Sequence, residues 1–456
     1  MRHSLFFIGS LGLMLIGNLA ADLPPTLPRY SLPVGRRLTY SGDDNFPYQA
    51  ANRSGSFNEL FSEQITVIGI NPDGSIRVFC RSGDRFVQNR HGQPTTLPQN
   101  QPEDVTLTQV DIFPDGRLVS VLGGFDADPP AVLCPLPADQ NELNGTWKNA
   151  PKLSDPEIYA SAGPSADGQW IFTGSVGGLD KLIYGMTTDR TYRFDLTRGV
   201  ITAIDTKSVQ DYGFHGAGGG TTHLDADEIL PPQQIASLAK DCATYFAADK
   251  AWGDQIAKVQ SLPKDASYVA AAKKILDDAA AAVTDPDIKA QLKTARHQVN
   301  EDAGDNVEQA QRIASVTNKP VIDISANDLD NHPHKLGDYR GKVLVLDFWY
   351  RGCGWCTRAM PEMKKVAEDF KGKPVQFLGM NVDSDPNDAK FVVNALGLTY
   401  PTLKINFATA NKFQVQGYPT ILVIDPTGIV RDYDEGYSPD LRTQLDQKIQ
   451  SALNGK

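Results

Sequence analysis

The sequence is short of positive charge. It contains 44 lysines and arginines against 55 aspartates and glutamates, which leaves a formal net charge of -11 over 456 residues. A protein that binds nucleic acid needs clustered lysine and arginine side chains to neutralise phosphates. Lysine and arginine residues do not cluster anywhere in this acidic sequence, so we expect no nucleic-acid partner.

Cysteine is scarce as well. The five cysteines are too few for a disulfide scaffold, and their odd number leaves at least one unpaired. Cys80 and Cys134 lie in short apolar stretches, which allow either a bridge between them or two buried free thiols; we favour the free thiols. Cys242 falls on an apolar stripe with helical spacing, so we expect it in a core.

Long apolar runs are absent beyond the N-terminus. The single run, residues 5–19, follows a charged start and precedes Ala20 and Ala21. As a helix at about 1.5 Å per residue it is too short for a bilayer core of about 30 Å, and its flanks are typical of a secretory signal peptide. We therefore expect residues 1–21 to be a signal peptide and the protein to be exported to the periplasm or cell envelope. An uncleaved N-terminal membrane anchor is the alternative.

Residues 22–229 are predicted to form an antiparallel β domain of unknown function. Short runs of alternating polarity are separated by turn signals such as Pro72-Asp73-Gly74 and Pro114-Asp115-Gly116. Proline fixes its own φ and glycine accepts positive φ, so these triplets predict hairpins in a sandwich or an open barrel. Residues 81–104 are expected to be a long exposed loop.

The glycine-rich segment "GFHGAGGGTTHLD", from Gly213 to Asp225, poses a separate question. It lacks the Gly-Lys-Ser/Thr ending of a phosphate-binding loop. His215, His223 and Asp225 are the residue types that ligate metals, but we favour a glycine loop without a ligand.

Two further regions follow the β domain. Residues 230–316 are rich in alanine with apolar residues at helical spacing, and Asp265 and Asp285 are predicted helix starts. Residues 317–456 alternate strand and helix patterns, which predicts a sheet covered by helices on both faces. The chain is therefore expected to be multidomain, with an N-terminal antiparallel β domain, an α-helical middle region and a C-terminal α/β fold.

The segment "LDFWYRGCGWCTRAMP" places Cys353 and Cys356 at the start of a predicted helix. Residues at i and i+3 share one helix face, so the two cysteines can bridge. The positive end of the helix stabilises a thiolate on Cys353, which can attack the disulfide of a partner. Cys356 would then resolve the mixed disulfide.

A zinc site is the competing interpretation of the two cysteines. It needs two more ligands, but the sequence has no second Cys-x-x-Cys pair. The nearest imidazoles, His332 and His334, stand in a predicted turn. The ligand count therefore favours a redox pair, and we predict no metal and no cofactor.

Several further features stand in order around the cysteines. Asp347-Phe348-Trp349 precedes them, Pro361 follows Cys356 by five positions, and "GYPTILVID" carries Pro419. The lead-in "LGDYRGK" precedes the strand, and an extra helix and strand are predicted over residues 387–406. In this combination the segment from about residue 319 to the C-terminus resembles the thioredoxin superfamily, in its exported TlpA/ResA-like branch.

The resemblance implies a thioredoxin-like fold and assigns roles to residues. Asp347 is implied to be a buried acid that deprotonates Cys356, with a solvent-facing aspartate at the strand end as the alternative. The implied substrate-binding residues, with Pro419 in a cis peptide bond, are Trp349, Trp355, Tyr418 and Pro419.

Four positions depart from the family pattern. Gly352 replaces the tryptophan that thioredoxins place before the first cysteine, and Gly379 stands where thioredoxins have a lysine near the acid. Many relatives have asparagine at position 347. Trp355 is unusual between the cysteines, where the dipeptide tunes the stability of the thiolate. These departures leave the direction of electron flow open.

The sequence thus predicts an exported thiol-disulfide oxidoreductase that reduces disulfides in other exported proteins. A membrane or periplasmic electron donor would keep it reduced. The same residues would also serve a protein that oxidises thiols or one that isomerises disulfides, so an oxidant and an isomerase are alternatives. The alternative from a different class is an envelope protein whose β domain binds a ligand or partner, with the thioredoxin-like domain as an accessory unit.

Overall fold

The computed structural model describes residues 27–50, 53–90, 104–123, 129–149, 155–261 and 267–455. The predicted signal peptide, residues 1–21, and the predicted helix start at Asp265 lie outside these ranges. Within them, no helix combines the length and the apolar character needed to cross a membrane.

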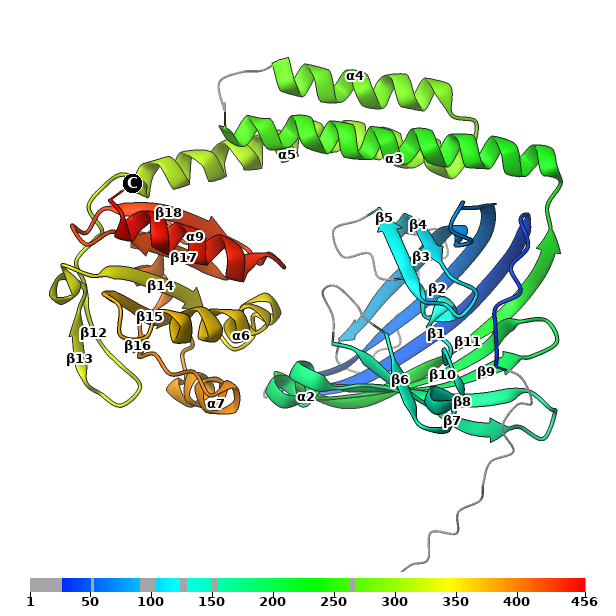
Figure 1. The fold of residues 1–456 in the computed structure, drawn as a ribbon, viewed down its shortest axis with the longest axis horizontal. Helices are drawn as coiled ribbons and strands as arrows, with labels where there is room; N and C mark the ends of the chain where they lie inside the picture. Colours follow the sequence, from blue (N-terminus) through cyan, green and yellow to red (C-terminus); the bar gives the residue numbers. More distant parts are fainter. Residues whose placement is uncertain are drawn as a thin grey trace, which may run out of the picture.

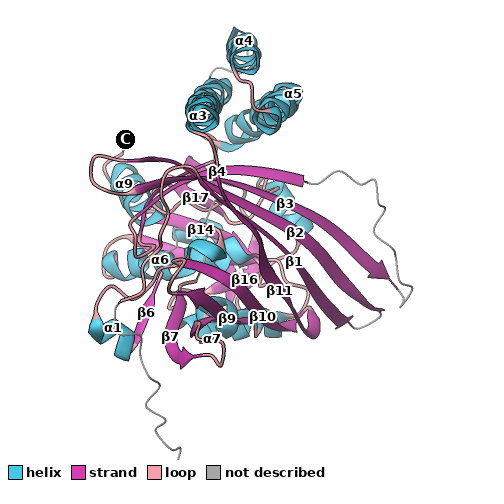
Figure 2. Cartoon of the chain, turned by 90° about the vertical axis from the view of Figure 1, so that its right-hand side faces the viewer, coloured by secondary structure: helices cyan, strands magenta, loops and turns pink. Residues whose placement is uncertain are grey.

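The N-terminal region is built on one antiparallel sheet of eleven strands. In chain order its strands are β1 (Arg36–Ala50), β2 (Arg53–Ile70), β3 (Ile76–Arg90), β4 (Asp104–Ile112), β5 (Leu118–Leu122), β6 (Thr146–Lys148), β7 (Glu157–Pro164), β8 (Trp170–Val176), β9 (Thr187–Asp195), β10 (Val200–Tyr212) and β11 (Phe214–Ile229). Sequence neighbours pair throughout, except that β1 pairs with β11 and leaves β5 and β6 as the two edges. The sheet is strongly curved (Figures 1 and 2). Of the two predicted architectures, the sandwich is therefore wrong, because all eleven strands belong to a single open sheet.

The hairpins form where the turn triplets predict them. Asn71 to Ser75 connect β2 to β3, with Gly74 at φ 84°, and Gly116 at φ 75° lies in the turn between β4 and β5. Positive φ is inexpensive only for glycine. The Pro-Asp-Gly signal therefore identifies both the turn and the residue that makes it possible.

The predicted loop over residues 81–104 is wrong in its first part. Residues 81–90 continue β3 and pair with β2, from Arg81 opposite Gln64 to Arg90 opposite Gly55. Polar residues and glycine occupy successive positions in residues 81–85, so the sequence lacks the alternation that signals a half-buried strand. Residues 91–103 lie outside the described part of the chain.

The predicted glycine loop is also wrong, because Phe214–Ile229 form strand β11. A Cβ atom on Gly216 would lie 2.2 Å from the carbonyl oxygen of Pro47, and one on Gly220 would lie 1.6 Å from that of Asp43. The glycines therefore serve the close approach of β1 to β11. Close backbone approach is one of the reasons why glycine occurs inside strands.

One aromatic core packs on the sheet. Trp147, Trp170, Phe172 and Tyr192 are buried in it, and the rings of Phe172 and Tyr192 stack at 4.6 Å between centroids. Cys80 and Cys134 lie in the same core, and both are free thiols. The favoured prediction for these two cysteines is therefore confirmed.

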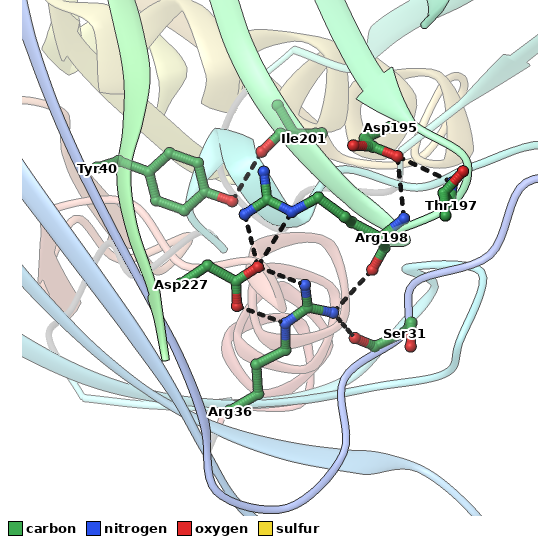
Figure 3. A network of polar contacts seen from close by, with 8 residues as sticks. All are labelled: Ser31, Arg36, Tyr40, Asp195, Thr197, Arg198, Ile201 and Asp227. Atoms are coloured by element: carbon green, nitrogen blue, oxygen red, sulfur yellow. Dashed lines mark hydrogen bonds and ion pairs between the residues drawn. The ribbon is translucent and has the colours of Figure 1, made fainter. Parts of the chain in front are cut away.

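A partly exposed ion-pair network fastens the start of the sheet (Figure 3). Asp227 on β11 accepts hydrogen bonds from Arg36 on β1 at 2.9 and 2.7 Å and from Arg198 at 2.6 Å. These arginines lower the pKa of Asp227 to about 2. Arg36 also donates to the carbonyl oxygens of Ser31 and Arg198. Since every charge in the network is paired, we assign it a structural role.

Three long helices follow: α3 (Pro232–Ser261), α4 (Ser267–Ala282) and α5 (Pro286–Val316). Leu238, Cys242 and Phe246 of α3 belong to one core with Ile68 and Phe79 of the sheet, so the helices pack on β2 and β3. Cys242 is buried there, as predicted. The side chain of Asp285 caps α5 by accepting from the backbone N–H groups of Asp287 and Ile288, which confirms the predicted helix start.

The C-terminal region is an α/β structure around a five-stranded sheet. Its elements are β12 (Ser325–Asn327), β13 (Pro333–Lys335), β14 (Val343–Trp349), α6 (Gly354–Asp369), β15 (Val375–Asn381), α7 (Pro386–Leu396), β16 (Thr402–Lys404), α8 (Phe407–Lys412), β17 (Thr420–Ile424), β18 (Val430–Glu435) and α9 (Leu441–Leu453). The strand order is β16-β15-β14-β17-β18, with β14 in the centre. β15 and β16 run parallel to it, while β17 is antiparallel.

Both faces of this sheet are covered, as the alternating pattern predicts. Helices α6, α7 and α9 pack on one face, and α8, with the end of α5, packs on the other. The element type changes between Ile229 and Pro232 and again after Val316, close to the predicted boundaries. The division of the chain into separate domains there stays a prediction.

Candidate redox site

The two cysteines lie at the connection between the central strand and the helix that follows it. β14 ends at Trp349, and Cys353 caps the N-terminus of α6, where its Sγ accepts the backbone N–H of Cys356 at 3.0 Å. The two residues form a disulfide, with their Cα atoms 5.2 Å apart. Cys353 is 6% exposed and Cys356 1% exposed, so the first cysteine is the more accessible. A sulfur at a helix N-terminus meets unpaired N–H groups that stabilise a thiolate.

Asp347 lies beneath α6, the redox helix, which begins at the two cysteines. Along β14, Val343, Val345 and Trp349 point into the core that contains both cysteines. Asp347 has the same strand parity, so it points to the α6 face as well. Its side chain is 2% exposed, which rules out the alternative of a solvent-facing aspartate. Burial raises its pKa to about 7, and a hydrogen bond from Tyr400 opposes the rise.

Tyr400 is the site residue that the sequence analysis missed. Its hydroxyl donates to Oδ2 of Asp347 at 3.3 Å, and it is buried beside Phe377. It comes from the segment after α7, far from the cysteines in sequence. No local pattern around Tyr400 distinguishes it from an ordinary core tyrosine.

Gly379 faces Asp347 directly across the β14–β15 pair. A Cβ atom there would lie 2.7 Å from Oγ1 of Thr402 and 3.0 Å from Nε1 of Trp349. The position where thioredoxins have a lysine is therefore filled by its neighbours. Asp347 depends on Tyr400 instead of a cation.

Trp349 is fully buried in the core that holds the disulfide. Its Nε1 has no hydrogen-bond partner among the described residues. Trp355 is partly buried against the same core, and its ring stacks on Tyr437 at 5.7 Å. Both tryptophans thus pack on the core that contains the disulfide, and Trp355 is the more exposed of the two.

Aromatic rings also gather at the loop that carries Pro419. The Tyr418–Pro419 peptide bond is cis, and the ring of Tyr418 meets those of Tyr350 and Phe407 edge-on at 5.3 and 6.1 Å. A hollow of about 480 Å³ adjoins them and is lined by Phe407, Asn411, Gln414, Val415, Gln416 and Tyr418. Phe407 is 55% exposed. The lining combines exposed aromatic rings with the amide side chains of Asn411, Gln414 and Gln416, so this surface can receive a peptide.

The histidines considered as metal ligands lie elsewhere. His332 and His334 both contact Oδ2 of Asp328 at 3.2 Å, and His215 contacts Asp211. Within the described ranges, no group of three or more His, Cys, Asp or Glu side chains is placed to hold a metal ion.

The comparisons with known proteins address this region. Residues 317–433 match the AhpC/TSA family. The thiol-disulfide oxidoreductase ResA of Geobacillus kaustophilus is 31% identical over 127 residues, which span 28% of this chain and 73% of the relative. The thioredoxin-like protein YneN of Bacillus subtilis is 27% identical over 130 residues, which span 28% of this chain and 75% of the relative.

A solved structure overlaps the same part. It is described as a thiol:disulfide interchange protein DsbE of Chlorobium tepidum, with 28% identity over 30% of this chain and 97% of the other, and a TM-score of 0.29. At that TM-score the overlap adds nothing to the sequence match. The sequence relatives share the C-terminal part alone, and about 30% identity over most of their length exceeds what a shared motif would produce. Through its C-terminal region, the chain therefore belongs to the ResA-like thiol-disulfide oxidoreductases of the thioredoxin superfamily.

Proposed function

We propose that this protein is exported and reduces disulfides in other exported proteins through Cys353 and Cys356. The observation that carries the proposal is the placement of Cys353 at the N-terminus of α6, above the buried carboxyl of Asp347. The first sulfur is the accessible one, and the second lies one turn further into the helix. This arrangement suits an attacking thiolate followed by a resolving thiol.

The reaction starts from the dithiol form. The Cys353 thiolate attacks one sulfur of the substrate disulfide, so that a Cys353–substrate bond forms, the substrate S–S bond breaks, and one substrate thiolate leaves and takes up a proton. Asp347 then accepts the proton of Cys356. The Cys356 thiolate attacks Sγ of Cys353, which closes the Cys353–Cys356 bond and releases the second substrate thiolate. Two electrons pass to the substrate, and the protein ends as the disulfide.

The substrate is proposed to lie across the aromatic surface beside Pro419. Trp355, Tyr418 and Phe407 offer apolar contact area, and the Oη atom of Tyr418 is buried with no hydrogen-bond partner among the described residues. An extended peptide can pair with backbone at such a site while its side chains fill the hollow.

Reduction requires a supply of electrons. After each turnover the Cys353–Cys356 disulfide must accept two electrons from a membrane or periplasmic donor, because exported proteins work where thiols tend to oxidise. Export rests on residues 1–21, and mass spectrometry of the protein recovered from cells tests it. A mature N-terminus at or next to Ala21 is expected, while an intact Met1 would favour the anchored form.

The direct test of the activity is insulin reduction with dithiothreitol. We expect the protein to accelerate precipitation of the insulin chains, Cys353→Ser to abolish the effect, and Cys134→Ala to retain it. Equal rates for Cys353→Ser and the unaltered protein would contradict the proposal. Cys356→Ser is expected to trap substrate proteins on Cys353 as mixed disulfides in an envelope extract.

One observation favours a second function, in which the β region binds a ligand. A cavity of about 730 Å³ lies between the free edges of the sheet, with Leu118 and Val119 of β5 on one side and Lys148 and Tyr159 of β6 and β7 on the other. Cavities of this size with apolar walls and a few charged groups are typical of small-molecule sites. The dye 1-anilinonaphthalene-8-sulfonate tests it: Val119→Trp should weaken dye binding and Val209→Trp, on an exposed strand position, should not. Equal binding by both variants would exclude the cavity.

A further inference from the structure

A short helix of the β region is docked against the redox helix. Ile183 of α2 (Gly178–Tyr184) is 0% exposed, and the buried residues around it are those of the C-terminal region, including Cys353 and Cys356. Leu179 and Tyr184 of α2 pack against the same core. A helix of seven residues has too little surface to bury a side chain by itself. The burial of Ile183 therefore comes from the contact between the two regions, which Figure 1 shows at the lower side of the molecule.

Arg351, two residues before Cys353, fastens one side of this contact. Its Nη2 donates to the carbonyl oxygen of Ile183 at 2.7 Å, and its Nη1 pairs with Asp388 of α7 at 2.8 Å. The guanidinium group lies between the rings of Tyr212 and Phe391, 4.0 and 4.1 Å from their centroids. Tyr212 is the last residue of β10, so a second element of the β region reaches the redox loop.

Two polar contacts fasten the other side, on the first turns of α6. The hydroxyl groups of Tyr184 and Thr357 lie 3.1 Å apart, and Thr357 follows Cys356 directly. Arg358 pairs with Asp180 of α2 at 3.3 Å. Asp155 accepts the backbone N–H of Asp180 at 2.8 Å, so the start of α2 is held to its own region while its other residues contact the redox helix.

A second flank of the cysteines lies beyond Tyr350, whose carbonyl oxygen accepts the N–H of Cys353 and whose ring contacts those of Tyr418 and Phe407. Phe407 and the hollow next to Tyr418 lie there, and Phe407 is more than half exposed. Among the described residues, the contacts of α2 and Tyr212 are with α6, α7 and the loop before Cys353, and none of these contacts reaches α8 or Pro419. The two flanks of the redox site therefore differ in accessibility.

We propose that α2 and Tyr212 form a specificity wall of the redox site. The wall occupies the α7 flank of Cys353 and so excludes bulky folded partners, which leaves entry for an extended cysteine-bearing segment across Phe407 and Tyr418. This inference rests on the proposed reductase function for its biological meaning. What it states about the structure is the accessibility of the Cys353 sulfur to large molecules, which can be measured without following disulfide reduction.

The test compares two reagents with the same chemistry and different size. In a Cys356→Ser background, the rate of modification at Cys353 is measured by mass spectrometry with N-ethylmaleimide and with a maleimide carried on a long polyethylene glycol chain. Asp180→Arg places a second cation next to Arg358, and like charges at an interface are strongly unfavourable. We expect the polymer reagent to react roughly tenfold faster or more with this variant, while the small reagent changes less than about threefold, because small molecules pass the wall already.

Controls separate undocking from damage. Asp180→Arg combined with Arg358→Asp restores the pair with reversed charges and should return the ratio of the two rates toward its original value. Asp254→Arg makes the same change on an exposed position of α3 and should leave the ratio unaltered. A change in charge near Cys353 alters the intrinsic reactivity of the thiolate toward both reagents by the same factor. It therefore leaves the ratio of the two modification rates unchanged. An unchanged ratio in both Asp180→Arg and Ile183→Asp would overturn the wall.

The two proposals can fail separately. If the protein reduces insulin while the ratio of the two rates is unchanged in both Asp180→Arg and Ile183→Asp, the wall is wrong and the reductase stands. If the ratio rises tenfold and neither insulin nor a small disulfide is reduced, the wall exists but does not serve a reductase, and the inference about substrate choice is overturned together with the proposed function.

Discussion

The β region and the C-terminal region bury the same residue types for different purposes. In the β region, Cys80 and Cys134 lie inside an aromatic core, and burial raises the pKa of both thiols well above its usual range. In the C-terminal region, Cys353 caps a long helix and its sulfur accepts a backbone N–H. A thiol in an apolar core stays protonated and inert, whereas one at a helix N-terminus becomes nucleophilic.

The buried carboxylates show the same contrast. Glu157 in the β region accepts hydrogen bonds from Tyr159 at 3.1 Å, Tyr192 at 2.7 Å and Arg190 at 2.9 Å. Asp347 receives one side-chain hydrogen bond within the described part of the chain, from Tyr400. A carboxylate with a full set of donors stabilises the fold, while one with few donors is free to exchange a proton near neutral pH.

The largest expected difference lies between the cysteines. We predict that iodoacetamide at pH 7 modifies Cys353 of the reduced protein at least about a thousandfold faster than Cys80, Cys134 or Cys242, since only a stabilised and accessible thiolate reacts rapidly. Time-resolved mass spectrometry of tryptic peptides measures all four rates in one sample. Comparable rates at Cys353 and Cys134 would remove the contrast on which the site assignment depends.

Neutralising the two carboxyl groups should change stability in opposite directions. The folded-state pKa of Asp347, about 7, exceeds its unfolded value. Above the unfolded pKa the unfolded chain therefore releases a proton that the fold retains, and stability falls as pH rises until the folded pKa is passed. Asp347→Asn should stabilise the C-terminal region at pH 8 by on the order of 4 kcal/mol, at about 1.4 kcal/mol per pKa unit, and by little at pH 4.

Glu157→Gln should instead destabilise the β region by about 3 kcal/mol, because it leaves Arg190 without its buried partner. Scanning calorimetry at pH 4 and pH 8 measures both variants. A loss of stability in Asp347→Asn at pH 8 would show that Asp347 is a structural carboxylate like Glu157.

The same change at Asp347 should slow the chemistry. We predict that Asp347→Asn slows the resolution of the mixed disulfide between Cys353 and a substrate about a hundredfold, a typical loss for a general base. Stopped-flow mixing of the dithiol form with a substrate disulfide measures this step as the release of the second substrate thiol. In the unaltered protein this rate should rise with pH through about 7, since the carboxylate form accepts the proton. A pH-independent rate would contradict this role, and Asp369→Asn, on the exposed end of α6, is the matched control.

The smallest expected effect concerns Tyr400. Its hydrogen bond favours the charged form of Asp347, so Tyr400→Phe should move the midpoint of that pH profile upward by about half a unit to one unit. The limiting rate at high pH should stay within about twofold, because the base itself is intact. A downward shift would mean that the hydroxyl group stabilises the protonated carboxyl instead.

Much of the redox site could be predicted from the sequence because its parts are close together in the chain. The strand end at Trp349, the helix start at Cys353 and the parity of Asp347 follow from local patterns. Tyr400 could not be predicted, since its contact depends on how the segment after α7 folds back. The docking of α2 was likewise invisible, because Ile183 looks like any apolar residue until the C-terminal region covers it.

The errors in the β region have physical reasons as well. Glycines in Gly213–Asp225 were expected to form a loop because a flexible residue usually marks one, whereas here the close approach of β1 requires them. Residues 81–90 were expected to be part of an exposed loop because polar residues and glycine follow one another in residues 81–85 without alternation. Local composition predicts how flexible and how polar a segment is. Whether the segment becomes a loop or a strand depends on pairing with strands far away in the sequence.

The measurement that tests the central claim most directly is the reduction potential of the Cys353–Cys356 pair. Equilibration of the full-length protein with thiol–disulfide buffers, read by mass spectrometry after alkylation, yields the fraction of disulfide at each potential. A protein that donates electrons to exported disulfides should have a value near that of thioredoxin, about -270 mV. A value near about -120 mV, typical of a strong oxidant, would contradict the account and reverse the proposed direction of electron flow.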